Sequence, residues 1–82
     1  SIMKSYETLT WRESMENGTI HIHTSQTPFF FVVHSPSGTS LSKMEGGTLL
    51  HRTETEVLTK FVVRATTPHV TFQLSPSYVS SN

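Results

Sequence analysis

The chain has 82 residues, no cysteine and a formal net charge of zero, with six Lys and Arg residues balancing six Glu residues. This length predicts one domain with a thin core, because a chain of this size buries only about 60% of the surface that its unfolded form exposes. The lack of cysteine excludes disulfides and thiolate metal sites, which leaves a histidine-bound metal or self-association as extra sources of stability. The zero net charge argues against nucleic acid as the main partner, because phosphate binding needs a basic surface.

The first predicted element is a β-hairpin over 5–25 that turns at Asn17-Gly18, because a type I′ turn needs positive φ at both central positions. A two-residue loop there sets Met15 opposite Ile20. This register sorts apolar and polar side chains onto opposite faces, and only Glu13 falls on the wrong side. The apolar face comprises Leu9, Trp11, Met15, Ile20 and Ile22, and the polar face comprises Arg12, Ser14, Glu16, Thr19, His21 and His23.

Five consecutive large apolar residues, Phe29-Phe30-Phe31-Val32-Val33, follow the hairpin and lead into the turn Ser35-Pro36-Ser37-Gly38. Such a run predicts a strand that is covered on both faces. Side chains alternate across a strand, so Phe30 and Val32 lie on one face and the other three on the opposite face. One face takes the core of the domain, and the pattern leaves open which one. The other face needs a second sheet or a second copy of the protein.

The C-terminal half predicts three further strands, at 48–53, 57–66 and 69–74. In the second of these, Leu58 and Val62 lie on the face away from its main apolar stripe, which indicates that this face is also partly covered. Residues 39–47 permit either one helical turn that ends at Gly46-Gly47 or a loop. Residues 75–82 predict a Ser/Pro-rich tail.

About six short strands without a substantial helix predict an all-β fold over residues 1–74, either a small antiparallel β-sandwich or a partly open barrel. Ser and Thr together make up 25 of the 82 residues, a composition typical of exposed β proteins such as adhesins and virion parts. No run approaches the roughly 20 apolar residues of a membrane span, and no signal peptide is visible at the start. On composition we expect a virion or extracellular surface location.

The sequence lacks the patterns of common catalytic sites. It has no Asp to orient a catalytic histidine, no Cys nucleophile, no Gly-x-Ser-x-Gly elbow and no Gly-rich phosphate loop. Glu13 is the one acid in an unusual position, and an edge location or a pairing with Arg or Lys accounts for it. We therefore expect that the protein is not an enzyme and needs no organic cofactor.

His21 and His23 are the candidates for a metal site, because they place two imidazoles about 7 Å apart on one strand face and imidazole is a common metal ligand. The segment His21-Ile22-His23 resembles the His-x-His pairs of trimeric phage tail fibres and spike tips. That resemblance implies an iron site in which a three-fold assembly supplies six nitrogen ligands. The competing interpretation leaves both histidines solvated on the hairpin. His34, His51 and His69 are each expected at a strand end or edge.

The residues together predict a non-enzymatic assembly module that homo-oligomerises through apolar strand faces, with further copies of the chain and another protein as partners. The predicted interface comprises Phe29, Phe30, Phe31, Val32, Val33, Leu58 and Val62. The alternative is a small nucleic-acid-binding β protein. In that case Arg52, Lys60 and Arg64 form the binding surface, with Phe61 and Phe72 nearby, since such surfaces interleave basic and aromatic side chains.

Overall fold

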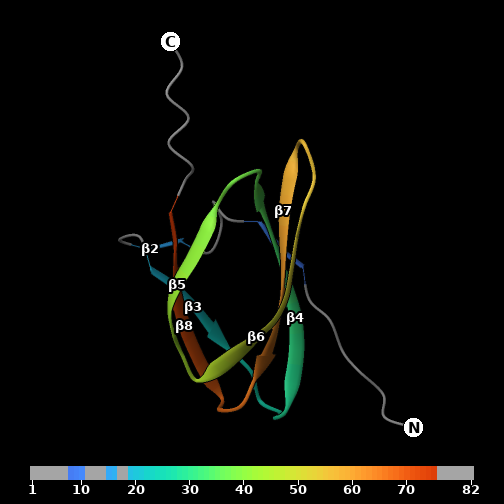
Figure 1. The fold of residues 1–82 in the computed structure, drawn as a ribbon. Coiled ribbons are helices and arrows are strands. Elements are labelled where there is room, and N and C mark those ends of the chain that lie inside the picture. The colour runs from blue at the N-terminus through green and yellow to red at the C-terminus, as the bar shows by residue number, and fades with distance from the viewer. Residues whose placement is uncertain (1–7, 11–14, 17–18, 76–82) are drawn as a thin grey trace, which may run out of the picture.

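The computed structural model describes residues 8–10, 15–16 and 19–75, and these form eight β-strands in two sheets (Figure 1). In chain order the strands are β1 (Thr8–Thr10), β2 (Met15–Glu16), β3 (Thr19–His23), β4 (Phe29–Pro36), β5 (Ser40–Glu45), β6 (Gly47–Glu54), β7 (Leu58–Ala65) and β8 (His69–Ser75). The sheet that we call sheet A has the order β1-β4-β7-β6, and sheet B has the order β2-β3-β8-β5. The predicted all-β class is confirmed. The described residues contain no helix that is long and apolar enough to span a membrane.

Each sheet is built on three longer antiparallel strands. In sheet A, β7 pairs with β4 and β6, and in sheet B, β8 pairs with β3 and β5. The short β2 continues sheet B antiparallel, whereas β1 joins β4 in parallel, which differs from the purely antiparallel fold predicted. A parallel pair needs a long crossover, and here the chain passes through β2 and β3 of the other sheet between β1 and β4.

The core lies between the two sheets and is formed by alternate residues of the four central strands. Its buried members are Ile20, Ile22, Phe31, Val33, Phe61, Val63, Ala65, Val70, Phe72 and Leu74. The rings of Phe31 in sheet A and Phe72 in sheet B stack across the two layers, with centroids 6.3 Å apart. This face-to-face packing fits a sandwich and does not form a closed barrel.

The N-terminal hairpin has the predicted register where the structure describes it, because Met15 lies opposite Ile20. Ile20 and Ile22 are buried, whereas His21 and His23 are exposed, in agreement with the predicted faces. The second strand of the hairpin, β3, is anchored in the fold by β8 on its other side. The predicted turn and part of its first strand, with Trp11, Arg12, Glu13, Ser14, Asn17 and Gly18, lie outside the described residues.

Residues 39–47 contain strand β5, where the sequence allowed only a helical turn or a loop. The strand is irregular, because Lys43 has a φ of 56° and the register with β8 shifts between Ser42 and Glu45. Leu41 and Met44 both pack against the core. Their spacing of three residues is unusual for a strand and typical of a helix, and it arises here because a bulge inserts an extra residue between them.

Three connections between the sheets meet at one end of the molecule and hydrogen-bond to one another (Figure 1). The β5–β6 connection turns at Gly46, whose carbonyl accepts hydrogen bonds from the backbone N–H groups of Thr66 and Thr67 at 2.8 and 3.1 Å. Those two residues belong to the β7–β8 connection. In the same connection the carbonyl of Pro68 accepts a hydrogen bond from the N–H of Thr24, in the β3–β4 connection, at 2.8 Å. This end of the molecule is therefore tied together by the backbone.

Candidate functional site

Strand β4 shows which face of the Phe29–Val33 run is the core. Phe31 and Val33 have no exposed surface and lie between the sheets. They are not available to another molecule, so we remove both from the predicted interface. Phe29 is half-buried and its ring stacks on Phe31 with centroids 6.4 Å apart, which makes it an extension of the core. A run of five apolar residues has no alternation, and this is why the pattern could not assign the faces.

The outer face of sheet A has an apolar centre with basic neighbours. Val32 lies opposite Val62 across the β4–β7 ladder, and both are half-buried. Phe30, also half-buried, lies opposite Arg64 in the same ladder. Lys60 is exposed on β7, two residues before Val62. These three apolar residues are the part of the predicted interface that the structure places together on one outer surface.

Strand β6 is the most exposed long strand of the described residues. It forms the edge of sheet A, and every residue after Gly47 is exposed. Leu49 is 38% exposed, and Leu50 is 47% exposed at a position where the register with β7 shifts and a bulge interrupts the ladder. In the described part of the chain β6 pairs with β7 alone. Among the described residues, no strand pairs with the other edge of β6, which therefore presents its backbone N–H and C=O groups.

The hairpin formed by β6 and β7 also exposes its tip. Val57 is 74% exposed in the connection, and Leu58, at the start of β7, is 43% exposed. Together with Leu49 and Leu50 they are the large hydrophobic side chains that the described part of the chain exposes. We call these four residues the β6–β7 apolar set. Leu58 belongs to the predicted interface, whereas the other three do not.

The three basic residues of the nucleic-acid alternative are not gathered on one surface. Lys60 and Arg64 project from the outer face of sheet A. Arg52 lies opposite Phe61 in the β6–β7 ladder, so it projects from the inner face, and its guanidinium carbon is 5.8 Å from the centroid of that ring. Phe61 and Phe72 are both fully buried, so neither ring is open to a base.

Arg52 is also engaged by an acidic neighbour on its own strand. Its Nη2 atom donates a hydrogen bond to Oε1 of Glu54 at 2.9 Å. The other carboxylate oxygen of Glu54 accepts a hydrogen bond from Oγ of Ser37 at 3.1 Å. The hydrogen bond from Arg52, and then the one from Ser37, hold the pKa of the Glu54 carboxyl below its usual value of 4.5.

A third histidine joins His21 and His23 on the outer face of sheet B. The β3–β8 register places His23 directly opposite His69. The ring of His69 lies 5.6 Å from that of His21 and 6.3 Å from that of His23, measured between centroids, and all three side chains are exposed. We call these residues the histidine cluster. As placed, no group of three or more His, Asp or Glu side chains in the described residues is arranged to hold a metal ion.

The remaining histidines lie on sheet A, away from this cluster. His34 is half-buried within β4, opposite Lys60, and His51 is exposed on the edge strand β6, opposite Val62. His51 is therefore at a sheet edge, as the sequence predicted, and His69 is at a strand start. His34 lies inside its strand instead, because β4 continues as far as Pro36.

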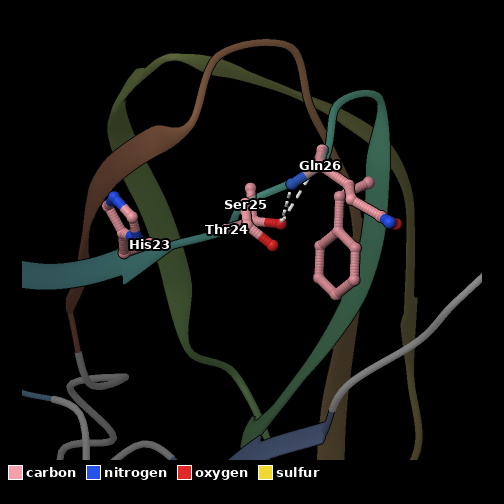
Figure 2. A pocket seen from close by; sticks show the side chains of 5 residues that line it. His23, Thr24, Ser25 and Gln26 are labelled. Carbon is pink, nitrogen blue, oxygen red and sulfur yellow. Dashed lines mark hydrogen bonds between the residues drawn. The ribbon is translucent and has the colours of Figure 1, made fainter.

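A polar hollow of about 220 Å³ lies beside His23 in the β3–β4 connection (Figure 2). It is also lined by Thr24, Ser25, Gln26 and Phe29. The Thr24 hydroxyl is used within the connection, because its oxygen accepts a hydrogen bond from the Gln26 N–H at 3.2 Å and donates one to the Gln26 carbonyl at 3.0 Å. Among the described residues that line the hollow, His23 is the one titratable side chain, and they do not supply the paired groups of general acid–base catalysis.

The structure thus offers two features that could contact another molecule or ion: the unpaired edge of β6 with its neighbouring apolar side chains, and the histidine cluster. No protein-family model matches the sequence, and no curated protein or solved structure is significantly similar to it.

Proposed function

We propose that the chain is a non-enzymatic β-sandwich module that assembles with a second copy of itself through the edge strand β6. The observation that carries this proposal is the exposure of β6 at the edge of sheet A. An edge strand presents unpaired N–H and C=O groups, and natural proteins usually protect it with lysine, proline or a very short length. β6 has eight residues and contains neither lysine nor proline.

A second copy is the occupant that the properties of β6 favour. Two β6 strands that pair antiparallel about a two-fold axis would join two A sheets into one continuous sheet, and such a contact closes on itself. The ion pair of Arg52 with Glu54 balances the formal charges along the strand, so the strand presents no net formal charge to a second copy. The net charge of zero also removes long-range repulsion between copies.

The energies favour a concentration-dependent dimer. Leu49 and Leu50 are already more than half buried, so covering them in both copies contributes roughly 3–6 kcal/mol of gross burial energy. Each new ladder hydrogen bond adds about 0.5–1.5 kcal/mol. Association costs about 4–15 kcal/mol in lost freedom of motion, which is of similar size. We therefore expect monomer and dimer to exchange with concentration.

This contact revises the interface that the sequence predicted. The core takes Phe31 and Val33, and the outer face of sheet A keeps Phe30, Val32 and Val62 at most half exposed. Of the predicted residues, Leu58 has the greatest exposure and lies on the hairpin that includes β6. The assembly function is kept, whereas its location moves from the strand faces to the strand edge.

Sedimentation velocity of the full chain over a wide concentration range tests the proposal. We expect the wild-type chain to shift from monomer to dimer as concentration rises. The double variant Leu49→Lys with Leu50→Lys should stay monomeric, because two ammonium groups would face two more across the axis. The matched control is Ser40→Lys with Ser42→Lys, which places two lysines at exposed positions of β5, the edge of sheet B.

Circular dichroism establishes that both variants are folded before their masses are compared. A wild-type chain that remains monomeric at the highest concentration would refute the proposal. An oligomer that persists unchanged in the Leu49→Lys, Leu50→Lys variant would also refute it, because assembly would then use another surface.

A further inference from the structure

We propose that the histidine cluster is a binding site for one first-row transition metal ion, with Zn²⁺ as its simplest occupant, built within a single copy of the chain. The three ligands are His21, His23 and His69. The inference is independent of the proposed assembly, because the cluster lies on sheet B and the edge strand β6 lies on sheet A.

The sheet fixes the positions from which the three imidazoles project. His21 and His23 are two residues apart on one strand face, and His69 stands directly opposite His23 on the neighbouring strand. The ring of His69 is therefore within 5.6 and 6.3 Å of the other two, measured between centroids. Strands β3 and β8 are held in this register by five consecutive residue pairs, so the three Cα positions are pre-arranged.

Rotation of exposed side chains completes the geometry. Zn–N bonds of about 2.0–2.1 Å set the bound nitrogens of a tetrahedral site roughly 3.3 Å apart. Rings with centroids 5.6 and 6.3 Å apart reach that separation when χ1 and χ2 turn their nitrogens toward a common point. All three side chains are exposed among the described residues, which leaves them room to rotate.

The surroundings suit a cation with an open coordination position. The described part of sheet B carries one ammonium group, that of Lys43, and it lies on the edge strand β5. Glu45 of the same strand is in register with Thr71, two residues from His69, and brings a negative charge to this sheet. Three histidine ligands leave a fourth position for water.

This site differs from the one implied by the His-x-His resemblance, in which three copies each contribute His21 and His23 to a shared axis. Here the third ligand comes from the same chain, so a monomer binds the metal. The participation of His69 is what distinguishes the two arrangements.

Isothermal titration of the full, tag-free chain with ZnCl₂, in parallel with Co²⁺ monitored by its visible absorption, tests the inference. We expect one ion per chain and an intense Co²⁺ spectrum typical of a low-coordinate site. His69→Ala should weaken Zn²⁺ binding by at least roughly tenfold, since loss of a mere supporting group already costs 10–100-fold in metal sites. His51→Ala removes an exposed histidine from β6 and should leave the affinity unchanged.

Three results would overturn the inference. One is the absence of Zn²⁺ binding at millimolar metal, and the second is equal affinity in the His69→Ala and His51→Ala variants. The third is one ion per three chains with formation of a trimer, which would assign the metal to a shared axis. The Leu49→Lys, Leu50→Lys variant should keep its metal affinity, so failure of the metal site and failure of the β6 contact are told apart.

Discussion

The two sheets share one core but present different features to their surroundings. β6, at one edge of sheet A, is an eight-residue strand with exposed leucines, whereas β5, at one edge of sheet B, has six residues, and each strand has one bulge. β5 also carries Lys43 at a φ of 56° in its irregular segment. A short length and a lysine are among the features that protect an edge from pairing, whereas a bulge is common to both strands. Of these two edge strands, β6 is the longer and the more exposed, and it lacks the lysine that β5 carries.

The outer faces of the two sheets also differ, because the centre of one is apolar and the centre of the other is polar. Sheet A presents Val32 and Val62 at its centre, whereas sheet B presents His21, Thr71 and Gln73 across β3 and β8. Both sheets contribute alternate residues to the core, so folding constrains their inner faces alike. Outer faces and edges are left to carry function, which makes them the places where the two sheets diverge.

Removal of one core ring from each sheet should have the largest effect and tests whether the sheets contribute equally. Phe31→Ala and Phe72→Ala each remove a fully buried ring of the stacked pair. We expect each to lower the free energy of unfolding by about 3–5 kcal/mol. Chemical denaturation measures the losses, with the half-buried Phe29→Ala as the control that should cost less. A loss near zero for one ring and a large loss for the other would show that a single sheet holds the core.

Substitution of Gly46, in the β5–β6 connection between the two sheets, should have the next largest effect on stability. Gly46 has a φ of 82°, and a Cβ added there would collide with the backbone carbonyl of His69 and lie 2.6 Å from Oγ1 of Thr67. Gly46→Ala should therefore lower the free energy of unfolding by about 1–2 kcal/mol for the backbone conformation, and further for the collision. Thermal unfolding by calorimetry measures the change, and Ser42→Ala on the exposed face of β5 is the control. A loss no larger than that of the control would contradict this role for the connection.

Local sequence patterns were sufficient in β3 and β8, where polar and apolar residues alternate. Ile20 and Ile22 are buried with His21 and His23 exposed between and after them, and Val70, Phe72 and Leu74 are buried in the same way. The Phe29–Val33 run has no alternation, so its faces became known only from the burial of Phe31 and Val33 between the two sheets. In β5 a bulge changes the spacing of the core residues to three, which a period of two does not detect.

The candidate sites depend on pairings that no local pattern contains. His69 joins His21 and His23 through the β3–β8 register, which connects strands far apart in the chain. The exposure of β6 did have a signal in the sequence. Leu49 and Leu50 are followed by His51 and Arg52, so the segment is neither alternating nor continuously apolar, and such a strand has no face that a core would cover.

The smallest expected effect concerns the ion pair between Arg52 and Glu54 on the edge strand β6. Arg52 and then Ser37 lower the pKa of Glu54 in the folded chain below its usual value of 4.5. The ionised carboxylate therefore stabilises the fold above pH 4.5, and this contribution is lost as the pH falls through the lowered pKa. Unfolding measured in dilute protein from about pH 3 to 7 should show the wild-type chain losing more stability in that window than Glu54→Gln. The difference should be small, because an exposed ion pair is screened by solvent. Arg52→Gln should reduce this loss of stability at low pH, because it removes the larger of the two hydrogen bonds that lower the Glu54 pKa. Superimposable curves for the wild type and Glu54→Gln would mean that the ion pair does not persist in solution.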